Sequence, residues 1–104
     1  MPDFELRPEV AVFAGLMEGR LRLKDPLVAS GRWTPWQEME PEALLDEAKR
    51  RLDDVWAAFG ADDGNGMLTE AVDAALFLMM FLDAMLGGKL AAAAAERTER
   101  DGRV

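Results

Sequence analysis

The sequence predicts an all-α fold, a helical bundle of three main helices with a C-terminal tail helix. β-Branched residues are scarce and no stretch alternates polar and apolar residues, whereas helical spacing of apolar residues occurs three times. The 104 residues suffice for one domain, residues 1–104, with a core over about 8–87 and a tail over 88–104. A chain this short buries roughly two-thirds of its unfolded surface, so a partner subunit would enlarge a modest core.

The first predicted helix extends from about Pro8 to Leu23. Proline suits a first helical position, because its missing N–H would be unpaired there anyway. One apolar stripe with helical spacing contains Val10, Phe13, Ala14, Met17 and Leu21. The next stretch, KDPLVASGRWTPWQEMEP, is rich in proline and glycine and therefore predicts a loop. Its two tryptophans, Trp33 and Trp36, favour an ordered lid or packing plug over a free linker.

The second predicted helix extends from about Pro41 to Phe59, and Gly60 ends it. Its expected apolar face comprises Leu44, Leu45, Ala48, Leu52, Val55, Trp56 and Phe59. The third helix, from about Met67 to Leu86, is apolar on nearly every side between Ala74 and Leu82. Such a helix needs cover on several sides, so we expect a homo-oligomer, a dimer or a tetramer, with this helix at its centre. The tail has high helix propensity but few core residues.

Composition excludes several classes of function. The chain has no cysteine and no histidine, which removes thiolate metal sites and the commonest general base. Its net charge of -8 would repel DNA and RNA, whereas a divalent cation could bridge an acidic pocket to a nucleotide. The longest apolar run, AALFLMMFL, is far short of the ~20 residues that span a bilayer. The N-terminus does not resemble a signal peptide. We therefore expect a cytoplasmic protein that does not associate with membranes.

Two acids, Glu70 and Asp73, stand at the head of the third helix and share one side of it because they are three residues apart. A capping role beside Thr69 accounts for Glu70, since an acid in the first turn is favourable. It accounts poorly for Asp73, because an unpaired charge within an apolar stretch is costly. A metal ion or a cationic partner would remove that cost. On the second helix, Glu47, Arg51 and Asp54 line a flank that could meet these acids, or could be solvated.

Three segments, in order, resemble the all-α nucleoside triphosphate pyrophosphohydrolases of the MazG-like superfamily, in particular the small phage-type dATP/dGTP diphosphohydrolase-like branch. They are FAGLMEGRLRLKD (13–25) followed by GRW (31–33), LLDEAKRRLDDVWAAF (44–59) and EAVDAALFLMM (70–80). In that family, E-x-x-E on one helix and E-x-x-D on the next bind Mg²⁺, which activates water to attack a nucleotide phosphate. The resemblance implies conversion of a (d)NTP to a (d)NMP and pyrophosphate, with Mn²⁺ as an alternative metal.

Carried over by position, the resemblance makes Asp54, Glu70 and Asp73 the catalytic and metal-binding acids, with Glu47 as a substitute ligand. The first acid of E-x-x-E is Arg51 here, and Leu76 stands where the family often has asparagine. A guanidinium about 5 Å from a divalent cation would be repelled by roughly 6 to 7 kcal/mol at an effective dielectric near 20. Three outcomes are open. Arg51 folds back onto Glu47, binds a substrate phosphate directly, or forms salt bridges in a site that no longer binds metal.

The remaining candidates are substrate-binding residues. Lys24 could reach a phosphate, Trp33 could stack on a base, and Glu18 could face the pocket. Each also has a structural alternative: an exposed lysine, a core plug and a surface charge. Two functions therefore follow from the sequence. The first is a Mg²⁺-dependent pyrophosphohydrolase, and the second is a catalytically impaired relative that binds nucleotide or a protein partner.

Overall fold

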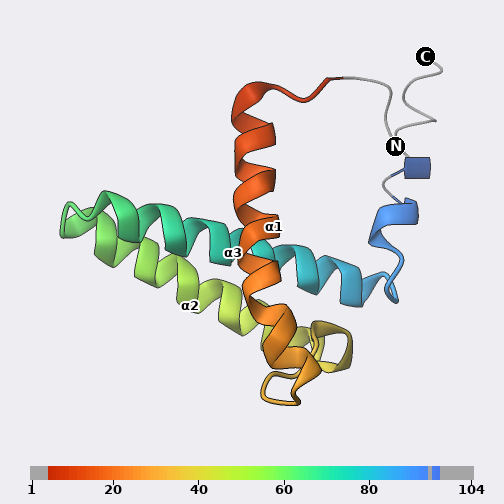
Figure 1. Ribbon diagram of the computed structural model, residues 1–104. Helices are drawn as coiled ribbons and strands as arrows, with labels where there is room; N and C mark the ends of the chain where they lie inside the picture. The colour runs from red at the N-terminus through yellow and green to blue at the C-terminus, as the bar shows by residue number, and fades with distance from the viewer. Residues whose placement is uncertain (1–4, 94, 97–104) are drawn as a thin grey trace.

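The computed structural model describes residues 5–93 and 95–96, and its elements are all helical within those ranges (Figure 1). In chain order they are α1 (Pro8–Ala29), the 3₁₀ turn η1 (Trp36–Glu38), α2 (Pro41–Gly60) and α3 (Gly64–Met85). Residues 90–93 and 95–96 form a further short helix. The predicted all-α class is confirmed for the described residues. No helix in these ranges combines the length and apolarity needed to cross a membrane.

Helix α1 is longer than predicted. It continues past Leu23 and includes Pro26, so the predicted loop starts only after Ala29. The helix ends in a Schellman motif: Arg32 N–H donates to Leu27 C=O at 2.8 Å and Gly31 N–H donates to Val28 C=O at 3.1 Å. Gly31 has a φ of 77°, which a glycine adopts without strain. The end of α1 is therefore set by this glycine and not by the proline.

Helices α2 and α3 form an antiparallel hairpin with a tight turn (Figure 1). Helix α3 starts at Gly64, three residues before the predicted Met67, because the side chain of Asp63 accepts a hydrogen bond from Gly66 N–H at 3.0 Å. Asp63, and not Thr69, is thus the N-cap. A second Schellman motif ends α3, where Gly88 N–H donates to Asp83 C=O at 2.8 Å.

The core lies between α2 and α3 and is covered on one side by α1 and η1. Its buried cluster consists of Leu44, Ala48, Val72, Leu76, Phe77 and Met80. Partly buried residues packed against it include Phe13, Met17, Leu21, Trp36 and Met39. The predicted apolar face of α2 is only partly correct, because Leu52, Trp56 and Phe59 are exposed on its flank.

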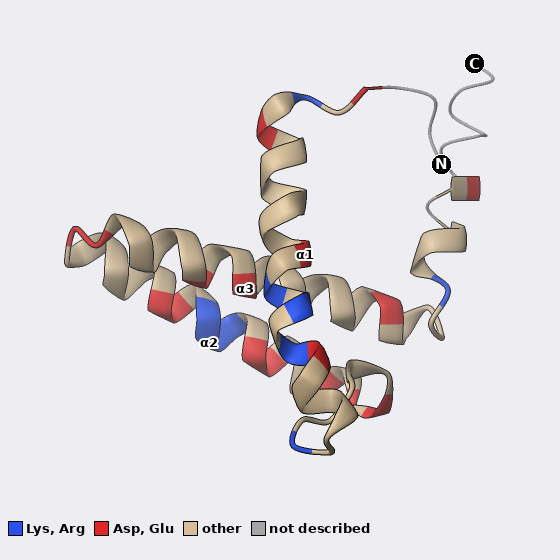
Figure 2. Cartoon of the chain, in the orientation of Figure 1, with Lys and Arg blue, Asp and Glu red and all other residues tan. Residues whose placement is uncertain are grey.

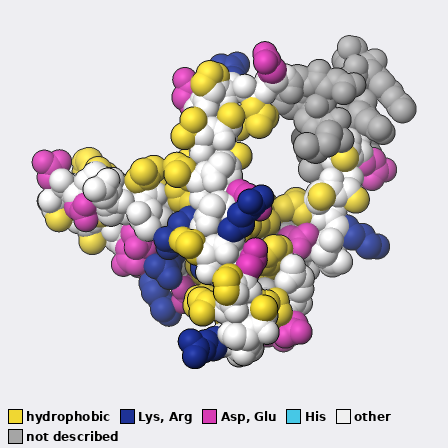
Figure 3. Space-filling model, viewed as in Figure 1, with side chains coloured by type: hydrophobic (Ala, Val, Ile, Leu, Met, Phe, Trp, Pro, Cys, Tyr) yellow, Lys and Arg dark blue, Asp and Glu magenta, His cyan; other side chains and the backbone are white. Residues whose placement is uncertain are grey.

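Helix α1 crosses the hairpin steeply, and its N-terminal half extends beyond it (Figure 1). No residue of Pro8–Ala29 is fully buried. The radius of gyration is 15.5 Å, compared with about 13 Å for a compact domain of this length. Figure 3 shows hydrophobic side chains on the surface of this free half. The single chain therefore leaves a large apolar surface uncovered.

Candidate functional site

Each of the three helices carries charged residues near the point where α1 crosses the hairpin (Figure 2). We call this group the charged cluster. It consists of Arg20 and Lys24 from α1, Glu47 and Arg51 from α2, and Glu70 and Asp73 from α3. The spacing of three or four residues within each pair places both members on one side of their helix. The cluster is thus a product of the crossing angle and of helical periodicity.

Asp73 is the one charged residue that is buried among the described residues, with 2% of its surface exposed. Arg20 holds it in a fork: Nε donates to Oδ1 and Nη2 donates to Oδ2, each at 2.9 Å. A fork of this kind is the strongest geometry for an arginine–carboxylate pair. The hydrogen bonds with Asp73 raise the pKa of Arg20 above its ordinary value, although burial acts in the opposite direction. Both oxygens of Asp73 are therefore engaged by the chain itself.

Arg51 lies between two glutamates. Its Nη1 donates to Glu70 Oε2 at 3.2 Å, and its Nε lies 3.9 Å from Glu47 Oε2. The longer distance is an ion-pair contact and no hydrogen bond, so the buried Nε–H lacks an acceptor among the described residues. Glu47 is paired more closely with Arg50, whose Nη1 lies 3.0 Å from Oε1. The basic pair Arg50–Arg51 thus neutralises Glu47 and Glu70.

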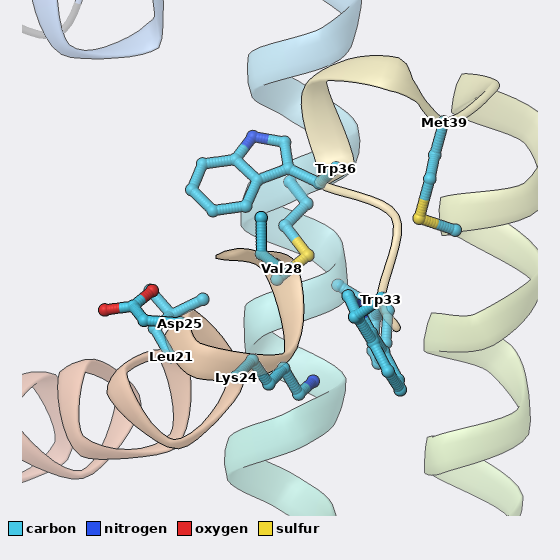
Figure 4. A pocket seen from close by; sticks show the side chains of 9 residues that line it. Leu21, Lys24, Asp25, Val28, Trp33, Trp36 and Met39 are labelled. Carbon is cyan, nitrogen blue, oxygen red and sulfur yellow. The ribbon is translucent and has the colours of Figure 1, made fainter. Parts of the chain in front are cut away.

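Lys24 has a different environment. Its Nζ lies 5.0 Å from the ring centroid of Trp33 and 5.0 Å from that of Phe77. Figure 4 shows the amine directed toward the Trp33 side, whereas the carboxylate of the adjacent Asp25 points away. Among the described residues, Lys24 forms no ion pair with a carboxylate. Burial lowers the pKa of Lys24 below its ordinary value; the positive charges of Arg20 and Arg51 act in the same direction, against Asp73 and Glu47.

We call residues 30–40, which carry Trp33 and Trp36, the tryptophan loop. A small cavity lies beside Lys24, between the end of α1, this loop and α3 (Figure 4). Its volume is about 40 Å³, and its lining is mostly apolar. Residues from three parts of the chain line it: Trp33, Trp36 and Met39 from the loop, Phe77 and Met80 from α3, and residues of the last turns of α1. Pockets for drug-sized ligands measure roughly 300 to 1,000 Å³. Trp36 packs against the core, whereas Trp33 is 39% exposed. The cavity has no room for a nucleotide base in this conformation.

The structure brings together six of the eight residues proposed from the sequence: Lys24, Trp33, Glu47, Arg51, Glu70 and Asp73. The other two lie apart. Asp54 is exposed and takes part in none of the hydrogen bonds or ion pairs found among the described residues. Glu18 is exposed and accepts a hydrogen bond from Arg22 at 3.1 Å.

Sequence reasoning missed Arg20, the partner of Asp73. A signal was present, because Arg20 and Lys24 continue the stripe of Met17 and Leu21 at helical spacing. The apolar residues of this stripe end at Leu21, so an apolar pattern does not include Arg20. Two basic residues on the buried side of a helix predict an acidic partner on the helix beneath.

The charged cluster does not fit Mg²⁺ with its side chains as they stand. Magnesium requires several oxygen ligands at about 2.0–2.1 Å, but Arg20 engages both oxygens of Asp73 and Arg51 engages one oxygen of Glu70. Within residues 5–93 and 95–96, no three acidic side chains are grouped so as to hold a metal ion. A metal would require displacement of both guanidinium groups, and Mg²⁺ or Mn²⁺ binding stays a prediction.

Comparison of the chain with models of protein families, with curated proteins and with solved structures finds no significant match.

Proposed function

We propose that this protein is a catalytically impaired MazG-like helical module that acts by associating with protein chains. The observation that carries the proposal is the fork between Arg20 and Asp73. Asp73 occupies the second position of the E-x-x-D pattern, where a hydrolase of this type needs a free carboxylate. Arg51 occupies an acidic position of the other pattern and donates to Glu70. Two guanidinium groups thus stand where a divalent cation would have to bind.

The exposed apolar surface supports association as the mode of action. Large hydrophobic side chains are exposed on all three helices, among them Val12 on α1, Trp56 on α2 and Met85 on α3. Monomeric soluble proteins rarely expose contiguous apolar patches of more than a few hundred Å², and larger ones mark interaction sites. The proposal includes self-association, as expected from the sequence.

A second candidate function is the Mg²⁺-dependent pyrophosphohydrolase. It is favoured by the positions of Glu47 and Glu70, which both contact Arg51 from neighbouring helices, and of Asp73, which lies three residues after Glu70 on α3. If a nucleotide and its metal displaced Arg20 and Arg51, these acids would be the metal ligands and the arginines would be free to bind phosphate oxygens. Lys24 is available for the same role, because no carboxylate is paired with it among the described residues.

One experiment separates the two functions. Purified protein is incubated with a panel of NTPs and dNTPs in the presence of Mg²⁺ or Mn²⁺, and pyrophosphate release is measured. The proposed function predicts no release above the protein-free control and no metal-dependent change in melting temperature. Release that is lost in Glu70→Gln but retained in Glu18→Gln would overturn it in favour of the hydrolase, because Glu18 lies outside the charged cluster.

A further inference from the structure

Helix α3 has a second apolar face, on the side away from the core. Six residues recur along it at spacings of three and four: Leu68, Ala71, Ala75, Leu78, Leu82 and Met85. This is the heptad spacing with which one helix packs along another. Its four large residues are exposed: Leu68 by 48%, Leu78 by 40%, Leu82 by 50% and Met85 by 62%. We call these six residues the α3 seam.

The α3 seam is separate from the face that packs in the core. At 100° per residue, Asp73, Leu76 and Met80 lie on the other side of α3, where α1 and α2 cover them. The six seam positions include no charged side chain, in a protein whose net charge is -8. A charge-free stripe over five turns of a surface helix is what an interface between helices requires.

We infer that the α3 seam binds the α3 seam of a second copy of this chain, in antiparallel orientation. Antiparallel pairing about a two-fold axis sets Leu68 against Met85, Ala71 against Leu82 and Ala75 against Leu78. Every alanine then faces a leucine, which fills the space between the helices evenly. Parallel pairing in register would set each alanine against itself and leave voids there. The pattern of small and large residues therefore selects the antiparallel orientation.

The charges at the two ends of α3 agree with this orientation. Asp62 and Asp63 precede the helix, and Lys89 follows it. Antiparallel pairing brings Lys89 of one copy near the acids of the other, whereas parallel pairing brings the acids of both copies together. Opposite charges at an interface favour the matching orientation and disfavour the other.

The size of a stable interface indicates that α1 must contribute to it. A seam about 26 Å long and 10 Å wide covers only part of the roughly 800 Å² that each partner buries in a standard dimer. Next to Leu68, a surface hollow of about 410 Å³ is lined by Val12, Phe13 and Leu16 of α1. Antiparallel pairing places Met85 of the second copy opposite Leu68 and hence at this hollow. A flexible methionine suits such an irregular gap.

This arrangement also accounts for the free half of α1. An isolated helix shorter than about 12 to 15 residues is marginal in water, so the projecting half needs a covering surface. The inference shares self-association with the proposed function, but it does not depend on the chemistry of the charged cluster. Pyrophosphate release would overturn the proposed function and leave the seam intact. A protein that is monomeric in solution would rule out pairing through the α3 seam. It would not affect the conclusion that Arg20 and Arg51 block the metal site.

Sedimentation equilibrium gives the first test. We expect a species of twice the 11.5 kDa chain mass at micromolar concentration. Leu78→Asp should weaken the dimer by about 100-fold or more, since it removes a buried leucine from both copies. Leu52→Asp on α2 is the matched control, with 54% exposure in the wild type and a position outside the seam. A wild-type monomer, or dissociation by Leu52→Asp but not by Leu78→Asp, would overturn the inference.

Cysteine cross-linking tests the orientation, because the natural chain contains no cysteine. Ala71→Cys and Leu82→Cys proteins, when mixed and oxidised, should give a mixed disulfide dimer in high yield. Neither variant should cross-link with itself, since two copies of position 71 would lie roughly 16 Å apart at 1.5 Å per residue. Efficient self-cross-linking of Ala71→Cys would show parallel pairing, and no cross-link in either experiment would place the interface elsewhere.

Discussion

Arg20 and Asp73 are 53 residues apart in the chain and are joined by two parallel hydrogen bonds of 2.9 Å between α1 and α3. The fork adds a polar contact to the crossing of α1 over the hairpin, where Met17 and Leu21 of α1 also pack against the core. It also neutralises the buried carboxylate of α3. The same residue pair thus stabilises the fold and closes the site at which metal chemistry was expected.

Substitution of Arg20 by methionine should destabilise the protein by about 2 to 3 kcal/mol. The change leaves the Asp73 carboxylate buried without its cation, and the partial exposure of Arg20 moderates the cost. Urea unfolding followed by circular dichroism measures the difference. Arg22→Met is the matched control, because Arg22 pairs with Glu18 on the surface and should contribute less than about 1 kcal/mol. Equal effects of the two substitutions would contradict the role of the fork.

Arg51→Glu should make the stability of the protein depend on a divalent cation that binds in the charged cluster. The added acid lies among Glu47 and Glu70, so repulsion destabilises the variant in EDTA, and Mg²⁺ or Mn²⁺ should restore stability. At a metal concentration ten times the Kd, the gain is about 1.4 kcal/mol, which thermal unfolding detects. Arg50→Glu, at an exposed neighbouring position, should respond less. A metal response in the wild-type protein equal to that of Arg51→Glu would refute this explanation.

The contribution of Lys24 should depend on pH in the alkaline range. Its pKa in the folded protein is lowered from 10.5, chiefly by burial. Between the two pKa values the unfolded chain binds more protons, so the unfolding free energy rises with pH relative to Lys24→Met. At pH values below the pKa of Lys24 in the folded protein, the amine is charged in both states, so the full cost of burying that charge lowers the unfolding free energy. NMR titration of the Lys24 side chain should give a midpoint below 10.5; a midpoint at or above it would contradict the burial between Trp33 and Phe77.

Asp83 should couple the tryptophan loop to the short helix after α3. Its Oδ2 accepts a hydrogen bond from Trp36 Nε1 and its Oδ1 accepts one from Leu90 N–H, both at 3.1 Å. Asp83→Leu removes both and should reduce the unfolding free energy by roughly 1 to 3 kcal/mol. Limited proteolysis should then be faster both in residues 30–40 and after residue 88. Trp36→Phe loses only the first bond, so the site after residue 88 should stay protected in that variant.

Local sequence patterns determined most of the helical structure. Pro8 and Pro41 at first helical positions, together with the apolar repeats, predicted the starts of α1 and α2. Helix α1 ends six residues after the predicted Leu23, because Pro26 is accommodated within the helix and the positive φ of Gly31 ends it. The stretch Ala74–Leu82 was predicted to need cover on several sides, and part of it remains uncovered in the single chain.

The candidate site was only half predictable from the sequence. Spacing alone placed Glu70 and Asp73 on one side of α3, and the interior position of Asp73 indicated that it needs a metal ion or a cationic partner. Which partner it has depends on the angle at which α1 crosses the hairpin, and that angle follows from packing between side chains distant in sequence. The same crossing leaves Asp54 in solvent and brings Lys24 onto Phe77. Helical periodicity thus determined the sides on which these residues lie, and only the tertiary structure decided which of them meet.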